Sequence, residues 1–244
     1  MAKILILAPS GFGKTTSWAG REKLGIKGLD PKETYVIQCI GRGVPNPEYK
    51  LCPSTEIKDM AKGNRVNVET LSGLERFQKV AELLDVLKKS PFVNIVIEDF
   101  NYLMQDYYMA NAMKGGWQTP KEIGYGVGLI FNAFRDFPED KHIYVFAHYD
   151  KTNDNDGQVT YKMKTTGKMV DEYCTPQGKF DIMLYGKQSY DDSKHKAIKM
   201  YVKDFDGTFP AKDSLGVLDD LPDEFPNDLY IVSEELKKRY NNIK

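Results

Sequence analysis

The chain opens with Lys3-Ile4-Leu5-Ile6-Leu7, followed by Ala8-Pro9-Ser10-Gly11-Phe12-Gly13-Lys14-Thr15-Thr16. The second stretch fits the phosphate-loop pattern G-x-x-x-x-G-K-[ST], with Ala8 in place of the first glycine. Gly11 and Gly13 let the backbone curl so that successive N–H groups point into one concavity. Because an apolar strand precedes it and a predicted helix follows, we interpret residues 9–16 as a nucleotide-binding loop rather than a chance glycine-rich turn.

The two residues after Gly13 carry the chemistry of such a loop. Lys14 is expected to reach the β- and γ-phosphates, and the Thr15 hydroxyl to ligate Mg²⁺. The predicted cofactors are therefore ATP and Mg²⁺.

Composition narrows the class of protein. The 244 residues are 41% hydrophobic and 28% charged, with a net charge of −1, so no overall basic field indicates nucleic acid. The three cysteines include no C-x-x-C pair, which predicts neither a disulfide framework nor a zinc site and suggests a reduced, cytoplasmic protein. No apolar run is long enough for a membrane helix.

Apolar strands alternate with helices or long connections along the chain. Strands are predicted over 3–8, 34–40, 65–69, 92–97, 142–147, 180–185 and 196–203. Helices are predicted over 14–24, from a Ser72 cap to Ser90, after Phe100, and over 127–134, while 115–128 is glycine-rich and 149–166 is polar and expected to be mobile. This pattern predicts one α/β domain over 1–244, with a mostly parallel sheet, helices on both faces and a C-terminal tail helix within about 222–244.

Two acids end the strand Ile95-Val96-Ile97, giving a Walker B pattern at Glu98 and Asp99. We assign the metal to Thr15 and Asp99 and the catalytic base to Glu98, with the reverse order of the two acids left open. The competing interpretation is a strand that ends in a helix-capping Asp.

Further along, His148 follows the strand 142–147 and is a candidate sensor of the γ-phosphate, or simply a polar strand end. Lys164, Lys168 and Lys212 are candidates for a cation supplied to a neighbouring subunit, although each alone is more typical of a solvated surface lysine.

Two stretches combine aromatic and basic residues in the way that single-stranded nucleic acid favours. One runs from Tyr149 to Met169 and includes Tyr161, Lys162 and Lys164. The other surrounds Gly115-Gly116, with Lys114, Trp117 and Lys121. Both signals are weak by themselves.

Several segments together resemble the phage-encoded RecA-like ATP-binding proteins associated with single-strand annealing recombination. They are Ile4–Thr16, Ile95–Met104, Val145–Tyr149, Lys164–Glu172 and Phe209–Gly216. The resemblance implies a RecA-like core with a strand inserted between the P-loop and Walker B strands, ATP and Mg²⁺, single-stranded DNA as partner, a possible ring or filament of identical subunits, and the host cytoplasm as location. It suggests that the loops after the Walker B helix and after His148 face DNA.

One departure from this family concerns the second strand. RecA-like recombinases usually carry a catalytic Glu at its end, whereas this strand ends in Gln38-Cys39. Either Glu98 acts as the base, or hydrolysis is slow and ATP mainly switches conformation.

Three functions fit these patterns. The favoured one is an ATPase acting on single-stranded DNA in phage recombination or replication. The alternatives are a nucleotide-gated structural or packaging-associated phage protein without a DNA role, and a small-molecule kinase, which the sparse Arg content disfavours.

Overall fold

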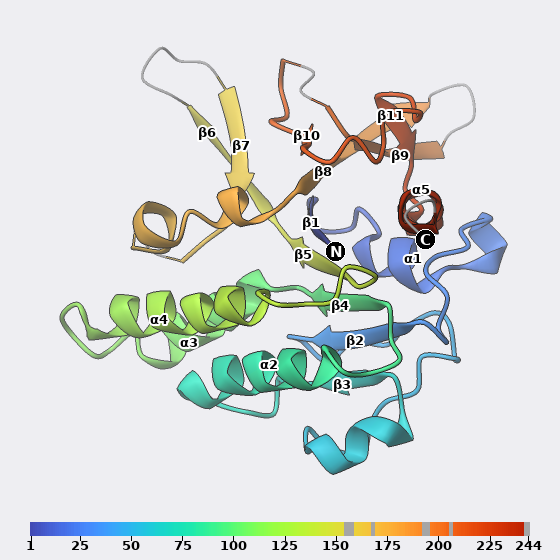
Figure 1. The fold of residues 1–244 in the computed structure, drawn as a ribbon. Helices are drawn as coiled ribbons and strands as arrows, with labels where there is room; N and C mark the ends of the chain where they lie inside the picture. The colour runs from blue at the N-terminus through green and yellow to red at the C-terminus, as the bar shows by residue number, and fades with distance from the viewer. Residues whose placement is uncertain (154–158, 167–168, 192–195, 205–206, 242–244) are drawn as a thin grey trace.

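A twisted sheet forms the centre of the computed structural model, which describes residues 1–153, 159–166, 169–191, 196–204 and 207–241 (Figure 1). Among these residues the sheet has nine strands. The order across it is β3 (Arg65–Asn67), β2 (Thr34–Gln38), β4 (Asn94–Glu98), β5 (His142–Ala147), β1 (Ala2–Leu7), β8 (Ile182–Asp191), β9 (Lys196–Val202) and β11 (Glu224–Pro226), with β10 (Lys212–Asp213) also paired to β8.

Neighbouring strands from β3 to β8 are all parallel, whereas β9, β10 and β11 pair antiparallel with their neighbours. β5 lies between β1 and β4, which confirms the predicted insertion of a strand between the P-loop and Walker B strands. The predicted α/β class with a mostly parallel sheet is confirmed. Near-continuous apolar runs form β1, β4 and β5 because both faces of these strands are buried.

Helices cover both faces of the sheet. On one face lie α2 (Gly73–Leu87), α3 (Asn101–Ala110) and α4 (Gln118–Ala133), and on the other lie α1 (Lys14–Ala19) and α5 (Leu229–Asn241) (Figure 1). The alternation of β1 separates two cores: Leu5 and Leu7 join the cluster under α2–α4, and Ile4 and Ile6 join the cluster under α1 and α5. Short turns complete the fold at η1 (Glu22–Leu24), η2 (Ile57–Lys62), η3 (Val170–Cys174) and η4 (Pro176–Lys179).

The helix predicted over 127–134 begins earlier than expected, because α4 starts at Gln118 and includes most of the glycine-rich stretch 115–128. Pro120 lies in the first turn, where a missing N–H costs nothing. Gly126 faces α2 so closely that a Cβ there would lie 2.5 Å from the Phe77 ring. Helix packing, which a local glycine count does not register, therefore explains at least this glycine.

The polar segment after β5, for which no regular structure was expected, includes two strands. β6 (Tyr149–Asn153) and β7 (Val159–Met163) form an antiparallel hairpin. Tyr149 and Tyr161 pack edge to face, with ring centroids 5.2 Å apart, and both contact Phe209. Aromatic burial at the base of the hairpin accounts for its order.

Two details of the helix ends differ from the sequence pattern. Ser72 precedes α2 but makes no side-chain capping bond, so the predicted capping box does not form. The segment predicted as a tail helix contains β11 and then α5, which starts at Leu229. Within the described ranges, no helix combines the length and apolar character needed to cross a bilayer.

Candidate nucleotide-binding site

Residues 8–13 form a tight loop between β1 and α1, and Lys14, Thr15 and Thr16 make the first turn of the helix. Gly11 and Gly13 have φ angles of 75° and 100°, which lie in the left-handed region that glycine adopts without strain. Phe12 is buried, and its ring lies 5.4 Å from that of Tyr201 on β9. The loop is thus anchored by Phe12, while Ser10 and Gly11 are exposed at its mouth.

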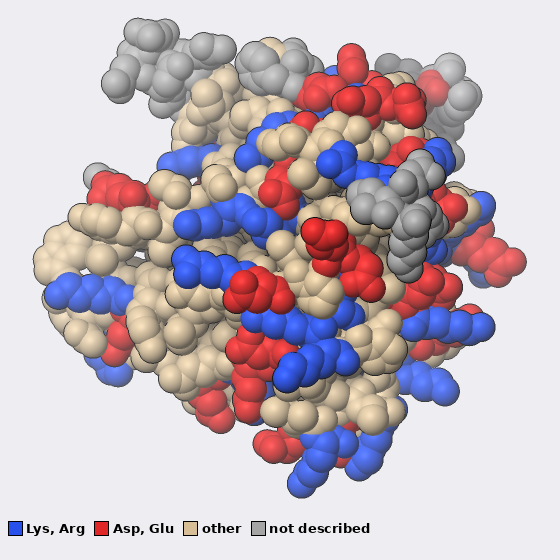
Figure 2. Space-filling model, in the orientation of Figure 1, with Lys and Arg blue, Asp and Glu red and all other residues tan. Residues whose placement is uncertain are grey.

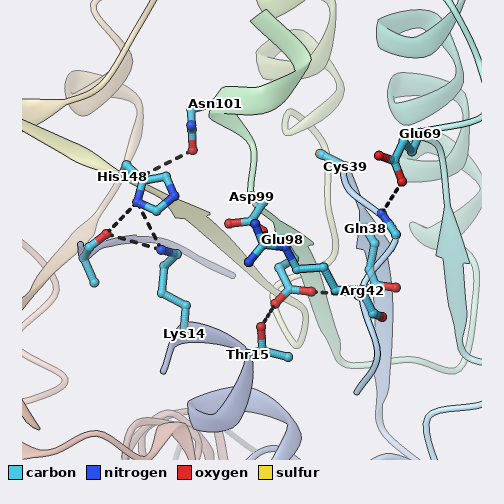
Figure 3. A network of polar contacts seen from close by, with 12 residues as sticks. Lys14, Thr15, Gln38, Cys39, Arg42, Glu69, Glu98, Asp99, Asn101 and His148 are labelled. Carbon is cyan, nitrogen blue, oxygen red and sulfur yellow. Dashed lines mark hydrogen bonds and ion pairs between the residues drawn. The ribbon is translucent and has the colours of Figure 1, made fainter. Parts of the chain in front are cut away.

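Lys14 begins α1, and its side chain turns back across the loop. Its Nζ donates to the carbonyl oxygens of Ala8 and Pro9, at 3.3 and 3.4 Å, and lies 3.2 Å from Nδ1 of His148 (Figure 3). Nδ1 also lies 3.1 Å from the carbonyl oxygen of Ala8, so it accepts from Lys14 in one tautomer and donates to Ala8 in the other. The ammonium group of Lys14 is therefore held between β1 and the end of β5.

Glu98, the last residue of β4, is 1% exposed and accepts three hydrogen bonds. Its Oε1 accepts from the Thr15 hydroxyl and from Nε1 of Trp18 at 3.2 Å, and its Oε2 accepts from Nε2 of Gln38 at 2.9 Å (Figure 3). The carboxylate of Glu98 is consequently fixed against the hydroxyl that the P-loop offers to a metal.

Asp99 has a different surrounding from its neighbour. It adopts a left-handed φ of 58°, which turns the chain from β4 into α3, and its carboxylate lies 3.4 Å from Nε of Arg42. Aspartate tolerates this conformation better than most residues. Of the two acids, the structure places Glu98, not Asp99, in contact with Thr15.

His148 follows β5 at the same edge of the sheet. Its backbone N–H donates to Oδ1 of Asn101 at 3.3 Å, which links the end of β5 to the first residue of α3. The carboxyl ends of β1, β4 and β5 therefore bring Lys14, Glu98 and His148 together, as the sequence predicts for one site.

Burial shifts the protonation of all three groups. It lowers the pKa of Lys14 to about 8, although the nearby Asp99 and Glu98 act in the opposite direction. Burial and then the charge of Lys14 lower the pKa of His148, so the imidazole is neutral at pH 7. Burial raises the pKa of Glu98 above its usual range, while the hydrogen bonds from Thr15 and Gln38 lower it.

Sequence reasoning missed Trp18, Gln38 and Arg42 as parts of the site. Gln38 was noted only as the absence of an acid, yet it connects Glu98 to Arg65, whose NH1 donates to its Oε1 at 2.7 Å. The position of Gln38 at the end of a predicted strand is a sequence signal that could have identified it as part of the site. No sequence signal identifies Arg42, because its loop reaches the site only through the pairing of β2 with β4.

Comparisons with known proteins add a likeness in backbone arrangement. No family model matches the chain, and a search of curated proteins found no match. Among solved structures, the chain is similar to a KaiC-like protein from the hyperthermophilic archaeon Pyrococcus horikoshii OT3, with 8% sequence identity and a TM-score of 0.42. The alignment covers 82% of this chain and 78% of that chain. The argument for function accordingly depends on the residues of the site.

The lysines considered for a neighbouring subunit differ in position: the backbone N–H of Lys164 donates to the carbonyl of His148 at 2.8 Å, so Lys164 adjoins the site. Lys164 is 3.5 Å from the carboxylate of Asp150 on β6, and Lys212 is in β10, the short strand beside β8. Lys168 falls outside the described residues.

Proposed function

We propose that this chain binds ATP with Mg²⁺ at residues 9–16 and hydrolyses it. The observation that carries the proposal is the contact between Thr15 of the P-loop and Glu98 at the end of β4, with Lys14 beside them. A magnesium ion bound to nucleotide needs only one or two protein oxygens, since phosphates and water supply the other ligands. The hydroxyl of Thr15 and the carboxylate of Glu98 fit that requirement.

This geometry supports an exchange of the roles first assigned to the two acids. Glu98 would hold the metal with Thr15, directly or through water, and the bound Mg²⁺ would supply charge stabilisation at the phosphates. Asp99 would then orient the attacking water, with Arg42 controlling its carboxylate. Lys14 would leave the carbonyls of Ala8 and Pro9 and bind the phosphates.

We also propose that His148 responds to the terminal phosphate. Lys14 Nζ and His148 Nδ1 are within hydrogen-bond distance, so a phosphate that recruits Lys14 changes the partner of the imidazole. The backbone N–H of His148 donates to Asn101, the first residue of α3, so a movement of His148 would be passed to that helix. We include His148 as the sensor on this basis.

Calorimetric titration with MgATP tests the proposal. Lys14→Ala should abolish binding at micromolar ATP, because the phosphates lose their buried cation. Lys23→Ala is the matched control, since Lys23 is an exposed lysine in the turn after α1. Glu98→Gln should bind ATP yet slow hydrolysis on the order of 10²-fold. Micromolar binding by the Lys14 variant, or unchanged hydrolysis by the Glu98 variant, would contradict the assignment.

We further propose single-stranded DNA as the partner, bound at the tip between α3 and α4. Met113 and Trp117 are 99% and 72% exposed there, and Lys114 and Lys121 flank them. Figure 2 shows that charged side chains are sparse over the ends of α3 and α4, where uncharged surface predominates. Exposed aromatic rings stack on bases, and lysines attract the phosphates.

The other DNA candidate, the stretch from Tyr149 to Met169, loses its stacking surface in the folded chain. Tyr149 and Tyr161 pack on each other and on Phe209, and Lys162 pairs with Asp171 at 3.2 Å. The tip therefore fits the role better than the hairpin. It is also connected to the nucleotide, because α3 begins two residues after Asp99 and spans about 15 Å to the tip.

Fluorescence anisotropy with a labelled oligonucleotide tests this partner. Binding should strengthen with ATP and weaken at higher salt. Trp117→Ala should weaken it about tenfold or more, within the 1–3 kcal/mol that one stacked base contributes. Tyr190→Ala is the matched control, because Tyr190 is 59% exposed on β8. Absence of binding at low salt with ATP would favour a nucleotide-gated protein without a DNA role.

A further inference from the structure

A cavity of about 780 Å³ lies beside the P-loop, on the side opposite to Glu98. Four segments bound it: the turn after α1, the end of β8 at Asp191, the first part of β9, and the junction between β11 and α5. Its lining includes Leu24, Lys27, Ile198, Lys199, Asn227 and Tyr230. The volume is within the range of small-molecule sites.

Two residues belong both to this cavity and to the back of the P-loop. Nζ of Lys199 donates to the carbonyl of Gly11 at 2.6 Å. Nδ2 of Asn227 lies 3.3 Å from the carbonyl of Phe12 and 3.4 Å from that of Gly13. The cavity therefore adjoins the loop that would hold the phosphates, through the side chains of Lys199 and Asn227.

The sheet order gives the direction in which a nucleotide extends. Thr15 faces Glu98 on β4, and Lys14 faces His148 after β5, so the terminal phosphate belongs on the β4–β5 side of β1. The rest of the molecule must leave on the other side of β1, which is occupied by β8 and β9. Ile198 and Lys199 lie on β9 opposite Ser189 and Gln188, toward the carboxyl end of β8, at the same edge of the sheet as the P-loop.

Specific contacts between distant segments hold the walls of the cavity in place. Asp228 accepts from the backbone N–H groups of Lys27 and Gly28, both at 2.9 Å, and so clamps the turn after α1 onto the start of α5. Lys27 covers the Tyr230 ring, with Nζ 4.2 Å from its centroid. Ile198 is 40% exposed.

Polar groups lie where the cavity meets the P-loop. Asn227 is 6% exposed, and its Oδ1 accepts no hydrogen bond within the described residues. A hydroxyl or amino donor would satisfy that atom. Lys199 supplies a cation at the boundary, where the first phosphate of a nucleotide would meet its nucleoside.

We infer that this cavity holds the nucleoside of the nucleotide, with Ile198 as its apolar wall. The inference rests on the proposed function, because it assumes that residues 9–16 bind the phosphates. It adds a source of affinity that the P-loop lacks: apolar contact with the base and ribose. Inorganic tripolyphosphate, which has no nucleoside, is the probe that separates the two contributions.

Calorimetry with ATP and with tripolyphosphate, each with Mg²⁺, tests the inference. The wild-type chain should bind ATP at least tenfold more tightly than tripolyphosphate. Ile198→Ser should weaken ATP at least fivefold and leave tripolyphosphate within twofold. Tyr230→Leu, on another segment, should show the same selectivity. Ile57→Ser is the matched control, because Ile57 is 42% exposed away from the cavity and should change neither affinity.

The outcomes distinguish the two proposals. Equal wild-type affinity for ATP and tripolyphosphate would overturn the nucleoside site and leave the P-loop assignment intact. Equal weakening of both probes by Ile198→Ser would also overturn it, since the side chain would then act on the loop and not on the nucleoside. Binding of neither probe would overturn the proposed function itself.

Discussion

Nε of Arg42 lies 3.4 Å from Oδ2 of Asp99, so the loop after β2 delivers a cation to the acid that follows Glu98. Arg42 is half exposed, whereas Asp99 is buried. Their pairing puts a positive charge beside the buried carboxylate of Asp99. The charge of Arg42 also contributes to the lowered pKa values of Lys14 and His148.

Arg42→Ala should reduce the turnover of ATP on the order of 10²-fold, the cost of losing one donor to a developing charge. ATP affinity should change much less. Arg42→Lys should retain part of the rate, because it keeps the charge but not the planar donor geometry. Steady-state hydrolysis and thermal unfolding should be measured together. An unchanged turnover with a lowered Tm would show that Arg42 only neutralises Asp99.

Gln38→Leu should shift the acidic limb of the hydrolysis profile to higher pH. The hydrogen bond from Gln38 lowers the pKa of Glu98, so its removal raises that pKa further. Glu98 acts as a carboxylate, and the variant should therefore lose most activity at low pH and recover as pH rises. Rates across pH 5–9 measure the shift. Gln78→Leu, on the exposed side of α2, is the control and should leave the profile unchanged. An unchanged profile for Gln38→Leu would show that Glu98 has no role in hydrolysis.

ATP affinity should fall as pH rises above about 8. The pKa of Lys14 without nucleotide is about 8, and phosphate binding favours its charged form, so binding takes up a proton above that pH. The loss should approach tenfold per pH unit until the pKa of the complex is reached. The phosphates, with a second pKa near 6, are fully ionised in this range and contribute no opposing slope. Lys14→Arg should bind without this dependence. A flat wild-type profile from pH 7 to 9.5 would contradict the pKa of Lys14.

Gly126→Ala should destabilise the fold by about 1–3 kcal/mol, the usual cost of overpacking. A Cβ at Gly126 would lie 2.5 Å from the Phe77 ring, at the contact between α4 and α2. Gly124 lies in the same helix with nothing within 4 Å of its added Cβ. Gly124→Ala should therefore stabilise by about 0.5–1 kcal/mol. Urea unfolding of both variants checks the pair, and equal effects would disprove the close approach at Gly126.

Much of the site was predictable from local sequence. Residues 9–16 specify their loop because glycine is needed at the left-handed positions and because Lys14 must follow them. The apolar runs of β1, β4 and β5 predict a buried parallel sheet, and a parallel sheet necessarily gathers the residues that follow its strands at one edge. Lys14, Glu98 and His148 are neighbours for that reason.

Other relationships depend on tertiary contacts between segments far apart in the chain. The sequence shows two adjacent acids, but only the pairing of β2 with β4 determines that Gln38 contacts Glu98 and that Arg42 contacts Asp99. The glycines of α4 are a second example. Locally they indicate a loop, and only the packing of Phe77 from α2 against Gly126 explains why a glycine stands in a helix there. The sequence by itself determined where the glycine loop before Lys14 forms, because that loop is built from one continuous segment. Only the tertiary structure decided which acid faces the P-loop and which cavity adjoins it, because those contacts join strands and helices that local patterns describe one at a time.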